Sequence, residues 1–224
     1  MNKELFSRSI GLLGEGNFAK LQDKTIAIFG LGGVGGTALE ALARTGFNHF
    51  ILVDFDEVEI SNLNRQILFT SKDIGKKKVV AAKERILSIN QDADIQIFCL
   101  KAQEFNFDQK IDFAVDAIDD VDGKLNILKN AQERNIPSIM SLGMARRFEP
   151  GLVKVAKLNQ TNNDPLAKKI RYLVKKSGLE TSNVPVVISM ELPKKSGEKL
   201  YSTMMVPSSA GLTIAKYILE TIIK

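Results

Sequence analysis

The stretch GLGGVG at positions 30–35 decides the fold, because its glycines Gly30, Gly32 and Gly35 have the Gly-x-Gly-x-x-Gly spacing. It follows an apolar run and precedes an amphipathic one, so a strand would lead through the loop into a helix. The glycines let backbone N–H groups approach a phosphate at the positive end of that helix. Asp54, about twenty residues further on, is placed to bond a ribose hydroxyl. This context favours an adenine-nucleotide site over a mere tight turn, and the loop alone would indicate NAD.

Short apolar runs alternate with amphipathic stretches over the first two thirds of the chain. This rhythm is typical of βαβ units and predicts an α/β fold: a Rossmann-like, mostly parallel sheet with helices on both faces. The expected strands are residues 25–29, 50–54, 95–100, 113–118 and 138–142, and the expected helices are 34–45, 76–89 and 121–134.

The pattern changes after Gly143. Residues 151–158 alternate apolar and polar side chains like a half-exposed strand, which predicts an antiparallel extension of the sheet. A basic helix is expected at 164–176 with Asp164 as its cap, followed by a strand between loops within 180–199. An amphipathic helix at about 208–223 would complete the chain.

Bulk composition excludes several classes of protein. The 224 residues are 44% hydrophobic, enough for a sizeable core, and the formal charge of +5 permits nucleic-acid binding without requiring it. The single cysteine, Cys99, rules out a disulfide framework and a Cys-x-x-Cys zinc pair. Because Cys99 falls in an expected strand, we expect a buried, inert thiol. This cysteine usage suggests a cytoplasmic enzyme, and neither a signal peptide nor a membrane span is expected.

The polar run DFDEVEISNLNRQ at 54–66 favours ATP over NAD. A nucleotidyl-transfer site must neutralise a triphosphate and its transition state with fixed cations and side-chain donors. Asn62 and Arg65 supply such groups, Lys78 supplies another, and Asp119 can hold magnesium. All four follow the carboxyl ends of expected strands, where open α/β sheets bind ligands.

These segments resemble the ThiF/MoeB/HesA superfamily, which includes the ubiquitin-activating enzymes. The matching pieces are GLGGVGG at 30–36, DFDEVEISNLNRQ at 54–66, IGKKKVVAAKERILSIN at 74–90 and VDAIDD at 115–120. The resemblance implies that Asp54 binds ribose, that Asn62 and Arg65 contact phosphates, that Lys78 contacts the triphosphate and that Asp119 supports Mg²⁺. The nucleotide-binding set would comprise Gly30, Gly32, Gly33, Gly35, Asp54, Asp56, Asn62, Arg65 and Lys78.

Arg8 matches an amino-terminal Arg that reaches the partner subunit's site in related dimers, so the resemblance also implies a homodimer and makes Arg8 a catalytic candidate beside Arg65, Lys78 and Asp119. A solvated helix residue is an equally good interpretation of Arg8.

The whole chain is similar to the tRNA threonylcarbamoyladenosine dehydratases. Beyond the nucleotide core, the segments that carry this resemblance are RNIPSIMSLG, DPLAKKIRYLVKKSG and MMVPSSAGLTIA. The resemblance implies ATP-dependent adenylation of the threonylcarbamoyladenosine carboxylate beside the tRNA anticodon. Cyclisation by intramolecular attack would follow, with net loss of water. Sulfur-transfer partner proteins are a further prediction. The alternative is a MoeB- or ThiF-like enzyme that activates the carboxylate of a ubiquitin-like sulfur carrier protein, which the absence of usable cysteines disfavours.

On this interpretation the chain is one domain over 1–224, with an N-terminal helical segment at 1–24, an ATP-binding core at 25–160 and a tRNA-facing subregion at 161–224. The tRNA phosphates would contact the basic helix and the loop that follows it, although a charge run is as often a solvated face. The candidate cations are Lys168, Lys169, Arg171, Lys175, Lys176, Lys194, Lys195 and Lys199. Arg146 and Arg147 stand where the family has a small, glycine-rich turn, and would grip the substrate carboxylate or anticodon phosphates.

Overall fold

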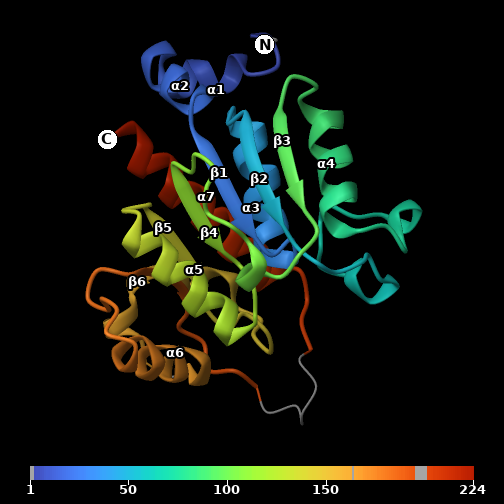
Figure 1. Ribbon diagram of the computed structural model, residues 1–224. Coiled ribbons are helices and arrows are strands. Elements are labelled where there is room, and N and C mark those ends of the chain that lie inside the picture. Colours follow the sequence, from blue (N-terminus) through green and yellow to red (C-terminus); the bar gives the residue numbers. More distant parts are fainter. Residues whose placement is uncertain (1–2, 163, 195–200) are drawn as a thin grey trace.

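The computed structural model describes residues 3–162, 164–194 and 201–224. The described strands form one seven-stranded sheet in the order β3-β2-β1-β4-β5-β7-β6 (Figure 1). Each neighbouring pair is parallel except β6 with β7, which is antiparallel. The predicted fold class is therefore confirmed. The strands are β1 (Thr25–Phe29), β2 (His49–Val53), β3 (Asp94–Phe98), β4 (Phe113–Asp116), β5 (Ser138–Ser141), β6 (Val153–Lys157) and β7 (Pro185–Ser189).

The α-helices of the described chain cover both faces of this sheet (Figure 1). They are α1 (Ser7–Leu13), α2 (Glu15–Gln22), α3 (Gly33–Thr45), α4 (Lys78–Ile89), α5 (Val121–Glu133), α6 (Pro165–Lys176) and α7 (Met205–Ile223). The last helix begins three residues before its predicted start. β4 ends two residues before its predicted end, because the chain turns after Asp116, whose carboxylate accepts the Ile118 N–H.

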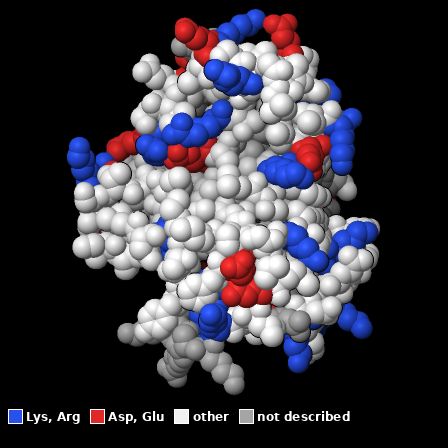
Figure 2. Space-filling model, turned by 180° about the vertical axis from the view of Figure 1, so that it is seen from behind, with Lys and Arg blue, Asp and Glu red and all other residues white. Residues whose placement is uncertain are grey.

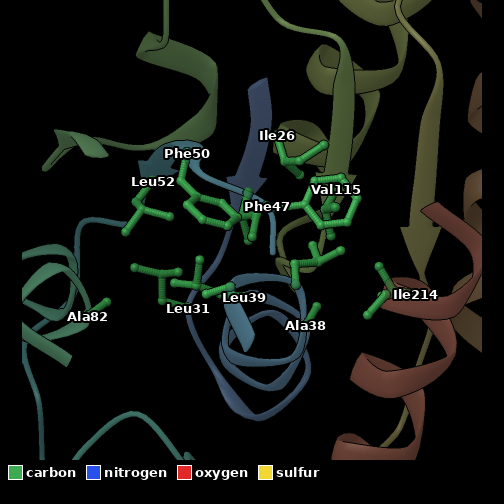
Figure 3. Packing of buried hydrophobic residues seen from close by; sticks show 14 of the residues in the cluster. Ile26, Leu31, Ala38, Leu39, Phe47, Phe50, Leu52, Ala82, Val115 and Ile214 are labelled. Atoms are coloured by element: carbon green, nitrogen blue, oxygen red, sulfur yellow. The ribbon is translucent and has the colours of Figure 1, made fainter. Parts of the chain in front are cut away.

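Alternating residues of the central strands enter two different cores, as the two-residue period of a strand requires. Ile26, Phe50 and Val115 lie with α3, α4 and α7 in the larger cluster, of which Figure 3 shows the centre. Ala27 and Ile51 face the opposite side, with α5 and the phenylalanines that follow β3. A third cluster joins α6 to β5 and β7. The packing thus fixes the central sheet from both faces and leaves its carboxyl-terminal edge to the loops.

The expectation of a buried cysteine is wrong. Cys99 is exposed, because β3 ends at Phe98 and is the edge strand of the sheet. As for the membrane, the described helices include none with the length and apolar content needed to cross one.

Candidate active site

A cavity of about 1090 Å³ opens where β1, β2, β4 and β5 reach their carboxyl ends. Its walls come from the glycine loop, the segment after β2, the start of α4, the loops after β4 and β5, and the start of α6. The order of the strands reverses between β1 and β4, and open α/β sheets bind their ligands in the crevice at such a point. The cavity therefore lies where the fold itself favours a ligand.

The glycine loop forms one wall through Gly30, Gly32 and Gly33. Gly30 has a φ of +87°, and a Cβ there would lie 2.8 Å from the Ala117 carbonyl oxygen, so the position requires glycine. Gly35 does not line the cavity. A Cβ at this position would lie 1.9 Å from the Gly30 carbonyl oxygen, so the lack of a side chain lets α3 start directly against the loop. The first turn of α3 thus presents backbone N–H groups at the cavity, where an anion is stabilised.

Asp54 joins the end of β2 to this loop. Its carboxylate accepts the Leu31 N–H at 2.7 Å and the Asp56 N–H at 2.9 Å. Burial raises the pKa of Asp54, while the nearby ammonium of Lys78 favours the ionised carboxylate. Lys78 Nζ in turn lies 2.7 Å from Asp56 Oδ2, and all three side chains line the cavity. The buried ammonium of Lys78 is therefore held in place before any ligand arrives.

The segment after Glu59 makes a short 3-10 turn, Ile60–Asn62, of which Asn62 lines the cavity, as does Arg65 shortly after it. Asn62 Oδ1 accepts the Glu59 N–H at 3.1 Å, and the Arg65 guanidinium donates to the Ser61 carbonyl at 2.8 Å. Arg65 is thereby supported from its own turn, with other N–H groups left for a ligand.

Gln66 is a cavity residue that the sequence analysis missed. It is buried, and its Oε1 has no hydrogen-bond partner within the described chain. A buried amide oxygen without a partner is costly, so a bound ligand or water is its natural complement. The one feature of the sequence that could have indicated Gln66 is its position directly after Arg65 in the polar run, because a single uncharged side chain has no motif of its own.

Asp119 lies in the loop after β4, exposed and lining the cavity, and makes no hydrogen bond or ion pair to another described residue. Within the described residues, no group of three or more His, Cys, Asp or Glu side chains is arranged to hold a metal ion. A divalent ion here would therefore need oxygen ligands from its substrate, which suits Mg²⁺ in nucleotide sites.

A buried ion pair lies at the start of the loop after β4. Lys124 Nζ lies 2.8 Å from Asp116 Oδ1 and donates to the Ser141 carbonyl at 2.8 Å, which ties the end of β4 to the end of β5. Burial raises the pKa of Asp116, although the ammonium of Lys124 favours its ionised form. Lys124 could not be singled out from the sequence, because a lysine on an amphipathic helix ordinarily faces solvent.

The two neighbouring arginines after β5 have different surroundings. Arg147 is buried: its guanidinium donates to the Gly143, Ala145 and Glu191 carbonyls and lies 3.3 Å from Asp164 Oδ2. Burial lowers the pKa of Arg147, and the carboxylate of Asp164 opposes this.

Arg146 has a φ of +61°, which is strained for a residue with a side chain. Its backbone is held by Tyr201 and Lys194, while its buried Nε has no partner within the described chain. Both arginines line the cavity. Arg147 donates to backbone carbonyls and pairs with Asp164, whereas no hydrogen bond joins the Arg146 side chain to another described residue.

Comparison with known proteins shows to which family this chain belongs. A model of the ThiF family matches residues 6–177. The chain belongs to the ThiF family. The predicted membership is confirmed.

Among curated proteins, the chain is similar to the tRNA threonylcarbamoyladenosine dehydratase of Bacillus subtilis, with 32% identity across 98% of this chain and 94% of that protein. A probable molybdopterin-synthase adenylyltransferase of Porphyra purpurea is 36% identical, but over only 60% of this chain. Among solved structures, the Escherichia coli tRNA N6-threonylcarbamoyladenosine dehydratase in complex with ATP has a TM-score of 0.92 and 28% identity over 98% of this chain and 94% of that one. The likeness to dehydratases thus extends beyond the nucleotide core.

The remaining predicted site residues that the structure describes do not line the cavity of this ThiF-family chain. Arg8 belongs to α1, which Figure 1 places beyond the amino ends of the strands, at the opposite end of the sheet from the cavity. Its proposed role in a partner's site stays a prediction.

The basic helix is α6, whose first residues line the cavity. Lys168, Lys169, Lys175 and Lys176 are exposed, whereas Arg171 is partly buried and donates to the Thr161 carbonyl at 2.7 Å. Lys194 packs over the Phe148 ring, and the predicted contacts of Lys195 and Lys199 lie outside the described residues.

Proposed function

We propose that this chain uses ATP to cyclise threonylcarbamoyladenosine in tRNA, beside the anticodon. The carboxylate of the modified nucleoside attacks the α-phosphorus of ATP and pyrophosphate leaves. A nitrogen of the same side chain then attacks the activated carbonyl and gives up its proton as AMP departs. The net result is loss of one water from the nucleoside. No enzyme thiol takes part, and ring closure is an intramolecular attack assisted by proximity.

One observation carries the proposal: a single cavity brings the glycine loop, Asp54, Arg65, Lys78 and Asp119 together in a chain whose likeness to dehydratases spans nearly its full length. Asp54 lies where a ribose would be held, and the fixed charges of Arg65 and Lys78 meet the phosphates. Cations held in place before the reaction stabilise the charge of the transition state without reorganisation.

Magnesium is part of the proposal. The free, exposed carboxylate of Asp119 fits a hard cation that takes its other ligands from phosphates and water. When bound, the ion would neutralise charge on the triphosphate. Asp119 is the residue that would hold it.

Arg146 belongs to the tRNA side of the cavity. The strand order β2-β1-β4-β5 separates Asp54, after β2, from Arg146, after β5, by three strand spacings, or about 14 Å. A nucleotide anchored at Asp54 would therefore leave Arg146 to the second substrate. We assign its unpaired guanidinium to the substrate carboxylate or a neighbouring phosphate, as a planar donor suited to either. For Arg147 this role stays a prediction that its existing contacts do not favour.

A homodimer is also proposed. The face seen in Figure 2 has a central band nearly free of charged residues, and Figure 1 places α7 behind the sheet, on that side. Leu152, Met205 and Leu212 are exposed on α7 and the adjoining turn, where Ser209 bonds the Pro150 carbonyl. Pairing of two copies would cover such a band and could bring Arg8 to the partner's cavity. Sulfur-transfer partners stay a prediction, and a tRNA substrate would place the enzyme in the cytoplasm.

The test is incubation with ATP, Mg²⁺ and tRNA that carries threonylcarbamoyladenosine, followed by digestion and mass measurement of the nucleosides. A product lighter by one water, with AMP formed in equal amount, is expected. A parallel reaction offers a ubiquitin-like carrier protein instead of tRNA. Adenylation of the carrier, with no dehydrated nucleoside in the tRNA reaction, would overturn the proposal in favour of the carrier-protein activity.

A further inference from the structure

A second, smaller hollow lies on the exposed face of α6, beyond the lining of the catalytic cavity. It has a volume of about 340 Å³ and is lined by Asn159, Lys168, Arg171, Tyr172, Lys175 and Thr181. Residues 168, 171, 172 and 175 of a helix share one face, so α6 itself supplies most of the wall. The aromatic ring in this wall, Tyr172, is 65% exposed.

The charges around Tyr172 are arranged evenly. Lys168 and Lys169 precede it by four and three residues, and Lys175 and Lys176 follow it by three and four, so all four are its neighbours on the helix surface. Each is exposed, and none forms an ion pair within the described part of the chain. An exposed ring alone needs no explanation. A ring with four unpaired lysines as its helix neighbours, two of which line the hollow with it, fits a ligand that is both flat and anionic.

Arg171 makes one side of the hollow rigid. Its guanidinium donates to the carbonyl and the hydroxyl of Thr161, which holds this side chain in the wall of the hollow. The hollow also lies at a useful distance from the catalytic cavity, whose lining includes Pro165, the first residue of α6. Seven residues separate Pro165 from Tyr172, about 10 Å along the helix axis. The neighbouring nucleotides of one RNA strand span such a distance.

We propose that Tyr172 and this hollow form a nucleobase-stacking site for an unpaired nucleotide of the RNA whose modified residue occupies the cavity. The base lies on the tyrosine ring, and the lysines contact the phosphates on either side. Single-strand binding proteins combine aromatic platforms with basic grooves in the same way. The inference rests on the proposed function for the identity of the RNA, and adds a contact with a base to the expected contacts with phosphates.

The absence of tryptophan from the chain allows a direct test. In Tyr172→Trp the indole is the sole tryptophan, and its emission reports on whatever stacks there. Titration with an anticodon stem-loop RNA should quench this emission saturably, whereas inorganic polyphosphate, which has charge but no bases, should leave it unchanged. Equal quenching by both, or by neither, would overturn the stacking site.

Affinity for the same RNA gives the second measurement. Tyr172→Phe keeps the ring and should bind within about twofold of wild type, while Tyr172→Ala should bind about tenfold more weakly. Tyr172→Leu is the matched control, because it retains apolar area without a flat π face, and should resemble the alanine variant. Full affinity in Tyr172→Leu or Tyr172→Ala would contradict stacking.

These outcomes are separable from the proposed function. Wild-type turnover of tRNA together with unaltered RNA binding by the tyrosine variants would reject the stacking site alone. Absence of a dehydrated nucleoside with the wild-type enzyme would instead reject the proposed function, whatever the fluorescence shows.

Discussion

The β1–β2 side of the cavity and its β5–α6 side hold their charged groups by different means. On the first side, Asp54 bonds backbone N–H groups near it in the fold, and Lys78 pairs with an acid of the run that follows β2. On the second side, Arg147 draws on Glu191, 44 residues away, and on Asp164, 17 residues away. The first side joins the glycine loop, the polar run after β2 and the start of α4, whereas the second side is held by contacts across the C-terminal third.

This difference suggests a division of labour. The scaffold of the first side suits the nucleotide, because the glycine loop, the polar run after β2 and the start of α4 hold its carboxylates and its ammonium in place. On the second side, the sequence of the loop after β5 can vary as long as the hydrogen bonds and the ion pair of Arg147 are kept. In this chain that loop places the strained Arg146 at the cavity. Strain of this kind persists where surrounding structure enforces it, and is common at binding sites.

The largest effect is expected at the boundary of the two sides, from Asp119→Ala. Loss of the carboxylate should lower the rate of AMP formation about 10³-fold, as removal of a charge-stabilising group does. Asp119 has no partner in the described chain, so the unfolding temperature should not change. Asp122→Ala, another exposed acid lining the cavity, is the matched control and should retain most activity. Normal turnover by Asp119→Ala would remove the magnesium assignment.

Arg147→Ala should be the most destabilising change on the second side. It leaves the buried Asp164 carboxylate without its cation, and breaking such a pair costs about 3–5 kcal/mol of unfolding free energy. Urea denaturation measures this loss, and Lys129→Ala, which removes only an exposed pair, should cost less than about 1 kcal/mol. If Arg147→Ala unfolds like wild type yet loses tRNA turnover, Arg147 serves the substrate directly and the contrast between the two arginines fails.

Arg146→Gly should show the opposite pattern. Glycine relieves the strain of a φ of +61°, which offsets its greater freedom in the unfolded chain, so the unfolding free energy should stay within about 1 kcal/mol of wild type. The kcat/KM for tRNA should fall about 10- to 100-fold, because a charged donor to the substrate is lost, while the KM for ATP stays unchanged. A parallel rise in the KM for ATP would place Arg146 with the nucleotide instead.

The same contrast explains what could be predicted from the sequence. Gly30, Asp54 and Lys78 were predictable, because each belongs to a segment with a recognisable motif that follows an expected strand. Lys124 was not, since its partners Asp116 and Ser141 are adjacent to it only after β4 and β5 pair.

Two further cases follow the same logic. The separate roles of Arg146 and Arg147 depend on backbone conformation and on residues 17 to 55 positions away, which no local pattern records. The burial of Cys99 was wrongly predicted, because the sequence does not mark where β3 ends at Phe98. Cys99 follows that end, and β3 lies at the edge of the sheet, so the side chain is exposed.

The smallest effect is expected furthest from the chemistry, from the double change Lys168→Glu with Lys169→Glu on α6. Reversing two exposed charges should weaken tRNA binding about tenfold at physiological salt and reduce the salt dependence of binding, since fewer counterions are released. The KM for ATP should stay constant, because neither residue lines the cavity. Lys129→Glu, an exposed lysine of α5, is the control and should not alter affinity. Unchanged salt dependence in the double variant would make the basic face of α6 a solvated surface, and would confine the tRNA side of the molecule to the loop that carries Arg146.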